Sequence, residues 1–239
     1  PQDTNPQDRP AGPSASAHVL PLGSLSPAVL GTGKPENVTA SLSAAEGGTV
    51  VAGNIGLSFS PKSLSEAGGD VSVKVAAQPN AGLPGGPAQY SPSGSIVDIS
   101  VQNSAGKPIT TFPDPVDILF KYNSADLTMA RGDPSVMTAA YVIDQNSPPL
   151  ENPLHFPIGT WVFFPPSNVK LDPTAGTIGV RTQAIGSIFS VVSAPVSYAE
   201  TLRDVQLFSS FDPRNSQLFG NKAKGATLQV VEPQIGDRL

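Results

Sequence analysis

Histidine is the side chain most often used for proton transfer at neutral pH, and this chain has only two histidines. His18 lies in a Pro-rich segment, and His155 lies in a short stretch bounded by prolines. A Ser-His-Asp triad would have to use one of them, and neither "GSLS" nor "SGSIVD" has the Gly-x-Ser-x-Gly pattern of a nucleophile elbow. We expect His155 to be a loop residue that packs on Phe156, and we predict no catalytic residue.

Two pairs of carboxylates are close enough in sequence to be compared with the acid and base of a glycosidase. They are Asp114 with Asp117 and Asp144 with Glu151. The distance between two carboxyl groups decides that chemistry, so we interpret these residues as solvated loop carboxylates. The chain has no cysteine and no calcium loop of alternating Asp and Asn that ends in Glu. We therefore predict no metal site and no cofactor.

The charge composition of the chain argues against nucleic acid and anionic membranes as partners. The net charge is -5 and only 14% of the residues are charged, so there is no basic surface for nucleic acid or for an anionic membrane. The longest apolar runs are strand-sized, far below the roughly 20 residues that span a bilayer. Low charge with abundant Ser, Thr, Gly, Asn and Pro is typical of exported surface proteins. Because the chain begins without Met, we expect a mature extracellular or cell-surface protein that has lost its export signal.

Short apolar segments separated by turn residues run along the chain from Gly47 onward. In "DVSVKVAAQ" the three residues Val71, Val73 and Val75 fall on one face of a strand, and "SGSIVDISVQNSAGKPI" has a similar pattern. About eight such segments follow one another, with Pro or Gly at most boundaries. The segment with the best helical spacing is "PVSYAETLRDVQLF", but Pro195 and the following β-branched residues keep any helix there short. The sequence predicts an all-β, immunoglobulin-like β-sandwich.

An aromatic cluster near residue 161 is a candidate platform for sugar rings. Strand alternation places Trp161 and Phe163 on the same face, which favours a core role for them, and leaves Phe164 as the better candidate for exposure. Trp161 and Phe164 are the candidate glycan contacts. Asn37 begins an Asn-Val-Thr sequon and is a candidate glycosylation site.

The order of several motifs is similar to that of a known family. "GGTVVAGNIGLSFSPKSL" is followed by "FPDPVDILFKYNSADL" and then by "GTWVFFPPSNVKLDPTAGTIGVRTQAIGSIFSVV". Over about 47–193 the chain thus resembles the ZU-type β-sandwich domain of ankyrins and netrin receptors. The resemblance implies a non-enzymatic, protein-interacting sandwich. The insertion from Pro79 to Pro92 and the missing basic character depart from that family, so the resemblance implies the fold and not the partner.

A second resemblance covers about 203–239. "VQLFSSFDPRNSQLFGNKAKGATLQVVEPQIGDRL" contains an apolar strand, a Pro loop, a Phe-Gly step, a Lys-Gly turn and a Leu-Gln-Val-Val strand. In this order they resemble the first part of a bacterial Src-homology-3-like domain. Such small barrels need further strands to close, so the resemblance implies a small incomplete β unit that is either truncated or completed by a neighbouring chain.

Residues 1–35 are expected to form an extended N-terminal arm. The arm is rich in Pro, Ser, Ala and Gly and has one apolar island, "HVLPLGSLSPAVL", so it buries too little surface to be ordered alone. If it is ordered, either its own domain or a neighbouring molecule must hold it. Strand addition by another copy would satisfy both the arm and an unclosed C-terminal sheet. The residues expected in these contacts between copies are Val19, Leu20, Leu22, Leu25, Val29, Leu30, Leu228, Val230, Val231 and Ile235.

Three segments follow from these patterns. We expect the arm over 1–35, a sandwich over 36–196 with sub-sheets that divide near 130–150, and a partial barrel over 197–239. The predicted function is that of a secreted or cell-surface structural protein, a filament or surface-layer type of subunit, which assembles with copies of itself and is not an enzyme. The alternative is a carbohydrate-binding or adhesion module of a larger surface protein, with surface glycans as partners.

Overall fold

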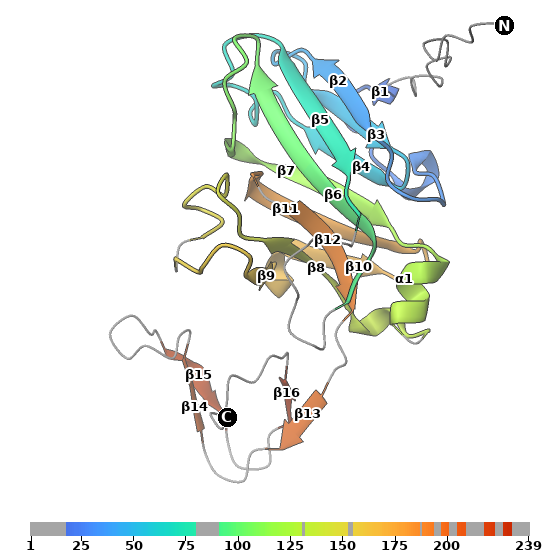
Figure 1. Ribbon diagram of the computed structural model, residues 1–239, viewed down its shortest axis with the longest axis vertical. Coiled ribbons are helices and arrows are strands. Elements are labelled where there is room, and N and C mark those ends of the chain that lie inside the picture. The colour runs from blue at the N-terminus through green and yellow to red at the C-terminus, as the bar shows by residue number, and fades with distance from the viewer. Residues whose placement is uncertain are drawn as a thin grey trace, which may run out of the picture.

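The chain folds as an all-β sandwich of two six-stranded antiparallel sheets in the computed structural model (Figure 1). The structure describes residues 18–79, 91–130, 132–152, 155–186, 188–193, 197–200, 205–208, 218–222 and 227–230. The first sheet contains, in spatial order, β1 (His18–Leu20), β3 (Gly48–Ala52), β4 (Ile55–Phe59), β7 (Thr111–Lys121), β11 (Thr177–Ala184) and β10 (Val169–Asp172). The second contains, in spatial order, β2 (Val38–Leu42), β5 (Val71–Ala77), β6 (Ser91–Asn103), β12 (Ile188–Ser193), β8 (Met137–Val142) and β9 (Trp161–Phe163).

In the part of the chain that the structure describes, helical structure is limited to short connections. They are α1 (Ser124–Met129) and the 3-10 turns η1 (Pro27–Val29), η2 (Pro134–Val136) and η3 (Pro166–Asn168). No helix among the described residues is long and apolar enough to cross a membrane. The predicted all-β class is therefore confirmed.

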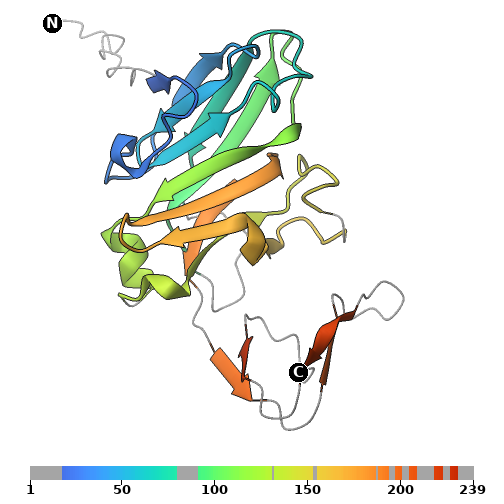
Figure 2. The ribbon, with the colours of Figure 1, turned by 180° about the vertical axis from the view of Figure 1, so that it is seen from behind.

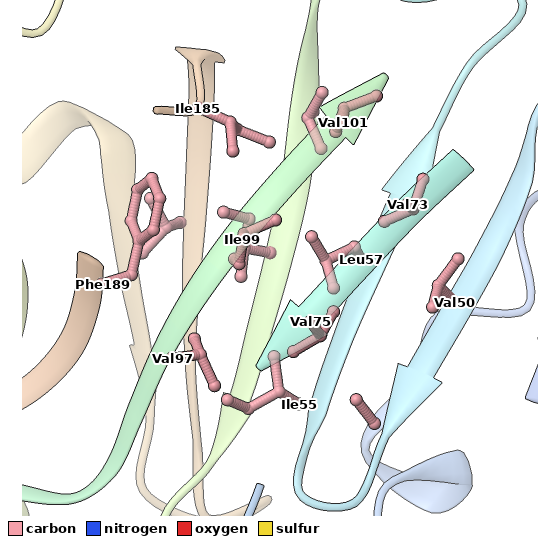
Figure 3. Close-up of a cluster of buried hydrophobic side chains, with 14 of the residues drawn as sticks. Val50, Ile55, Leu57, Val73, Val75, Val97, Ile99, Val101, Ile185 and Phe189 are labelled. Carbon is pink, nitrogen blue, oxygen red and sulfur yellow. The ribbon is translucent and has the colours of Figure 1, made fainter. Parts of the chain in front are cut away.

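The core lies between the two sheets because apolar residues alternate along the strands. In β5, Val71, Val73 and Val75 are buried, whereas Lys74 between them is exposed. Figure 3 shows the inward side chains of both sheets meeting in one layer. Valine and isoleucine dominate this layer, which suits the β-branched preference of strands. The members labelled there are Val50, Ile55, Leu57, Val73, Val75, Val97, Ile99, Val101, Ile185 and Phe189.

A buried polar cluster ties the two sheets together at the end of the sandwich where α1 lies. Asn54, in the turn between β3 and β4, donates through Nδ2 to Ser95 Oγ on β6 (2.8 Å) and to the carbonyl of Lys121 on β7 (2.9 Å). Ser95 Oγ donates in turn to Asp126 Oδ2 in α1 (3.2 Å). Asn54, Ser95 and Asp126 are each 0% exposed. Since buried polar groups are costly unless paired, the cluster fixes α1 against strands of both sheets.

Strands from both halves of the chain contribute to each sheet. β7 pairs with β11 in the first sheet, and β6 pairs with β12 in the second. The expected division into sub-sheets near 130–150 therefore does not occur, and the chain instead passes from one sheet to the other through α1. The sandwich also begins at β1 and not at residue 36, because β1 is a member of the first sheet.

The order of strands gives the sandwich two opposite lateral edges. β1 and β2 are the terminal strands of their sheets and contact each other, which defines one edge. β10 and β9 terminate the sheets on the other side, and β10 contacts β8 of the facing sheet. The connection between β8 and β9, drawn in yellow, projects near this second edge in both Figure 1 and Figure 2, away from β1.

The C-terminal part of the described chain forms two small ladders. β13 (Ser197–Glu200) pairs with β16 (Thr227–Val230), and β14 (Val205–Phe208) pairs with β15 (Leu218–Lys222). The stretch with the best helical spacing in the sequence thus contains two strands, in agreement with its β-branched residues and Pro195.

Candidate functional site

The N-terminal segment, residues 18–36, lies on its own sandwich. β1 pairs antiparallel with β3, with Val19 opposite Val50 and Leu20 opposite Thr49. The expectation of a separate arm is therefore wrong for residues 18–35, because the main-chain partners of β3 are supplied within the same chain. Residues 1–17 of the expected arm lie outside the described residues.

Packing and hydrogen bonds hold this segment on the outer face of the first sheet. Leu25 and Leu30 cover Gly56 of β4, where an added Cβ atom would overlap Leu25 Cδ1 and lie 3.0 Å from Leu30 Cδ2. Lys121 Nζ donates to the carbonyl oxygens of Pro27 (3.2 Å) and Leu30 (3.3 Å). Leu30 is only 4% exposed, and Leu25 is half-buried. Both residues are used for packing within the chain, which corrects their expected role as contacts between copies.

Two large apolar side chains of the same segment face solvent. Val19 is 45% exposed and Leu22 is 46% exposed, whereas Leu20 and Val29 are half-buried. Residues 18–31 contain no Asp, Glu, Lys or Arg. We call Val19 and Leu22 the N-terminal patch. These two side chains belong to a stretch without charged side chains of its own, and they are the predicted assembly residues of the segment that are most exposed.

The predicted assembly residues at the C-terminal end are only partly described. Leu228 and Val230 belong to β16, opposite Ala199 and Ser197 of β13. Their backbone is thus paired within the chain. Val231 and Ile235 lie outside the described residues.

A second exposed apolar surface lies in the loop between β8 and β9. Leu150 is 56% exposed, Phe156 is 38% exposed and Ile158 is 72% exposed. We call these three residues the loop patch. The sequence does not mark these residues as a surface, because the stretch "PPLENPLHFPIG" has neither a strand nor a helix period that would place its apolar residues on one face.

The loop that carries this patch is held by hydrogen bonds at several points. The hydroxyl of Tyr141 donates to the carbonyl of Glu151 (2.7 Å). The side chain of Asn152 accepts from the backbone N–H of Phe156 (2.6 Å) and donates to its carbonyl (2.9 Å). At the base, the N–H of Gly159 donates to the carbonyl of Ile143 (2.7 Å). These bonds order the backbone that presents the loop patch.

Burial raises the pKa of Tyr141 to about 12 from its ordinary value of 10.0, and the charge of Glu151 adds to this rise. The neutral hydroxyl is therefore the form that this site favours, and only the neutral form can donate to the carbonyl of Glu151.

The aromatic cluster does not form an exposed platform. Trp161 and Phe163 share a face, as predicted, and pack with Ala140 and Val142 in a small cluster separate from the main core. Phe164 is 7% exposed, so the expectation that it would be the exposed member is wrong. Its ring lies in the core, stacked on Phe189 at 5.9 Å and tilted against Tyr141 at 4.9 Å. The prediction for Phe164 failed because strand β9 ends at Phe163, and the alternation of inward and outward side chains does not extend beyond the strand.

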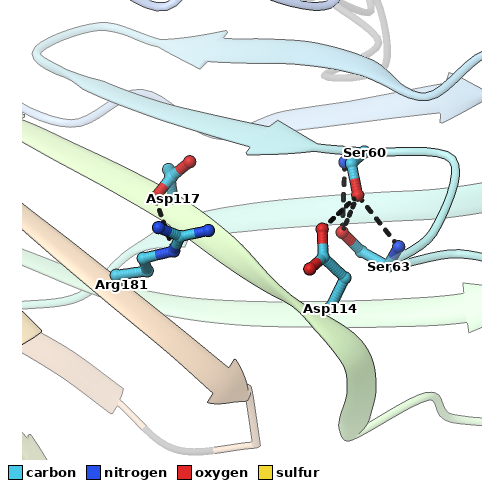
Figure 4. Close-up of polar contacts among 5 residues, drawn as sticks. All are labelled: Ser60, Ser63, Asp114, Asp117 and Arg181. Atoms are coloured by element: carbon cyan, nitrogen blue, oxygen red, sulfur yellow. Dashed lines mark hydrogen bonds and ion pairs between the residues drawn. The ribbon is translucent and has the colours of Figure 1, made fainter.

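The candidate carboxylates make separate contacts. Asp114 accepts a 2.8 Å hydrogen bond from Ser60 Oγ, whereas Asp117 lies 3.8 Å from Nε of the exposed Arg181 (Figure 4). Ser60 is also bonded reciprocally to Ser63, so Asp114 stabilises a turn. These contacts bring no nucleophile and histidine together.

The other candidate acids lie in the β8–β9 loop. Asp144 accepts from the N–H of Asn146 (2.6 Å), and Glu151 is 4% exposed. His155 is exposed and adopts a positive φ of 55°, a turn conformation. Within the described residues no group of three or more His, Cys, Asp or Glu side chains is arranged to hold a metal ion.

The candidate glycosylation residue, Asn37, is exposed and directly precedes the edge strand β2. Its Oδ1 accepts a 2.9 Å hydrogen bond from the N–H of Ala77 at the end of β5. Thr39 of the sequon is also exposed. Modification of Asn37 stays a prediction.

Comparison of the chain with protein-family models and with curated proteins gave no match. The resemblances to ZU-type and Src-homology-3-like domains therefore stay predictions from the sequence.

Proposed function

We propose that this chain is a structural subunit of an extracellular or cell-surface assembly and that it associates with other copies of itself. The observation that carries the proposal is the N-terminal patch. Val19 and Leu22 are both nearly half exposed, residues 18–31 contain no Asp, Glu, Lys or Arg, and Val19 belongs to the edge strand β1. Apolar side chains that face solvent gain free energy when a partner covers them.

The β1 edge also favours addition of a further strand. β1 is the terminal strand of its sheet, so its outer main-chain groups lie at an edge. An edge strand offers N–H and C=O groups to an approaching strand, and apolar side chains such as Val19 supply the packing that gives register. Both contributions are available to a second copy of this chain, whose edges have the same composition.

The alternative role in carbohydrate binding has less support. Sugar-binding sites generally expose the face of an aromatic ring, but the rings of Trp161 and Phe164 are 9% and 7% exposed. The acidic net charge of -5 likewise favours neither nucleic acid nor anionic lipid as a partner. Association of like copies through uncharged apolar surface is compatible with both facts.

Light scattering on the purified full chain tests this proposal. The double variant Val19→Ser with Leu22→Ser is compared with the matched control Met129→Ser, which removes an exposed apolar side chain (40% exposed) from α1. We expect the unmodified chain and the control to associate as concentration rises, and the double variant to remain monomeric. Equal association of the double variant and the unmodified chain would contradict the proposed role of the N-terminal patch. Circular dichroism checks that the variants are folded, since exposed substitutions usually change stability by within about 0.5 kcal/mol.

Antibody labelling of intact native cells tests the location. Labelling without permeabilisation is the expected result. Labelling that appears only after permeabilisation would contradict a cell-surface role.

A further inference from the structure

The polar cluster formed by Asn54, Ser95 and Asp126 contains two acceptor atoms that have no hydrogen-bond partner among the described residues. They are Oδ1 of Asn54 and Oδ1 of Asp126, and both atoms are buried. The side chains that carry them are 0% exposed, so bulk solvent does not reach either oxygen. In native proteins nearly all buried polar atoms have a partner. The two oxygens therefore indicate a donor that the described side chains do not supply.

The donors that the described contacts place at this cluster are already engaged. One hydrogen of the Asn54 amide is donated to Ser95 Oγ (2.8 Å) and the other to the carbonyl of Lys121 (2.9 Å). The hydroxyl of Ser95 donates to Oδ2 of Asp126 (3.2 Å), and the backbone N–H of Asn123 donates to the same oxygen (2.7 Å). The N–H of Lys121 donates to the backbone carbonyl of Asn54 (2.8 Å). None of these groups has a hydrogen left for either Oδ1 atom.

The orientation of the Asn54 amide is fixed by its contact with Lys121. A flipped amide would turn its oxygen toward the carbonyl of Lys121, and two acceptors do not bond to each other. The flip would also leave Ser95 Oγ without the hydrogen bond that it accepts from Asn54. The cluster therefore requires the orientation in which Oδ1 has no partner among the described residues.

The two oxygens define the chemistry of what binds between them. Both are acceptors, so the bound molecule must donate two hydrogen bonds, which excludes an anion and an apolar molecule. The side chains around it are fully buried, so it must be small. Water has two donor hydrogens, and a buried water generally bonds to about two to four otherwise unsatisfied polar groups. With bonds of about 2.8 Å, one water can bridge two oxygens that lie up to roughly 5.5 Å apart.

We propose that one water molecule is bound inside the sandwich at this cluster and donates one hydrogen to Asn54 Oδ1 and the other to Asp126 Oδ1. Both side chains already bond to the same hydroxyl, Ser95 Oγ, so their terminal groups are held close together. Asn54 belongs to the turn between β3 and β4, and Asp126 belongs to α1. The water thus completes the polar link between the first sheet and the helix, and it leaves only when one of these elements moves.

A high-resolution crystal structure of the unmodified full chain tests this proposal without altering the cluster. The expected result is a single water within about 3.2 Å of both Oδ1 atoms. Three other results overturn the proposal. They are no density between the two oxygens, direct hydrogen-bond contact of the two oxygens with each other, and a metal ion with contacts to both oxygens as short as about 2.3–2.6 Å.

Magnetic relaxation dispersion of the water signal counts long-lived internal waters in solution and supplies a second test. Asn54→Leu replaces the amide by an apolar group of similar size, and we expect its count to be lower by one than that of the unmodified chain. Thr49→Val is the matched control, because it removes a buried hydroxyl that is already bonded to Ser58 Oγ (3.4 Å) and should leave the count unchanged. An equal count in Asn54→Leu and the unmodified chain overturns the proposal. If Asn54→Leu does not fold, the crystal structure of the unmodified chain decides.

Discussion

Leu25 packs directly on Gly56, and the missing side chain of Gly56 is what allows the N-terminal segment to lie flat on the first sheet. The contact explains why residues 18–31 belong to the sandwich and do not extend from it as an arm. Lys121 strengthens the same contact by donating to two carbonyl groups of the segment.

Substitution of Gly56 should release this segment. In Gly56→Val the new side chain would occupy the position of the Leu25 and Leu30 methyl groups. We expect hydrogen exchange of the Gly31 amide, which donates to Gly53 O at 2.9 Å, to accelerate at least about 10-fold, equivalent to about 1.4 kcal/mol. Gly179→Ala is the matched control, because its nearest contacts lie at 3.7 Å. Unchanged protection of Gly31 in Gly56→Val would show that Leu25 does not hold the segment.

A disulfide can report whether β1 docks on its own chain. The protein has no cysteine, and Leu20 lies opposite Thr49, so the pair Leu20→Cys and Thr49→Cys places two thiols at facing positions of an antiparallel ladder. In the double variant, mild oxidation should give a cross-linked monomer. A mixture of the two single variants should give no disulfide-linked heterodimer. Efficient cross-linking in that mixture would mean that β1 is exchanged between copies.

The hydroxyl of Tyr141 should make stability depend on pH in the alkaline range. Its pKa in the folded protein, about 12, lies above the ordinary value of 10.0, so the folded state favours the neutral form. This stabilisation is complete below pH 10 and disappears as the pH rises toward 12. Urea unfolding of Tyr141→Phe should show a loss of about 0.5–1.5 kcal/mol at pH 7, from the missing bond to Glu151, and a flatter profile between pH 10 and 12. Parallel profiles for the two proteins would contradict this assignment.

The carboxylate of Asp98 should lower the stability of the protein at neutral pH, whereas the hydroxyl of Tyr141 raises it. Asp98 lies at the exposed surface of β6, and its partial burial raises its pKa above 3.8; Asp144 raises the pKa further and Lys74 opposes the rise. The favourable contribution of the protonated form is complete below the unfolded pKa and is lost as the pH rises through the folded pKa, so the carboxylate destabilises the protein at pH 7. Asp98→Asn should therefore raise the unfolding midpoint at pH 7 and leave it unchanged below about pH 3. Asp133→Asn is a contrasting control, because hydrogen bonds from Ser135 lower the pKa of Asp133 and its substitution should lower the midpoint.

The sandwich was predictable from the sequence because its signals are local. The alternation of Val71, Val73 and Val75 requires one buried face whatever the strand pairs with. It was harder to predict where a segment packs against residues that are distant in sequence. The apolar residues of 18–30 were recognised, but their partner, Gly56, is a residue without a side chain, so no pattern marks it as a docking position.

Helix α1 and the burial of Phe164 could not be predicted from the local pattern of apolar residues. Helix α1 is too short for an apolar period, although Asn123 and Asp126 form a reciprocal capping box that a search for helix starts would have found. Phe164 was expected at the surface because alternation was continued past the end of β9. Its burial depends on Tyr141 and Phe189, which come from strands distant in sequence.

Sedimentation velocity of the unmodified full chain decides whether the chain associates with copies of itself. Self-association requires a weight-average mass that rises with concentration. A single monomeric species at every concentration up to roughly 1 mM, where even a contact of about −4 kcal/mol would be half populated, would contradict it.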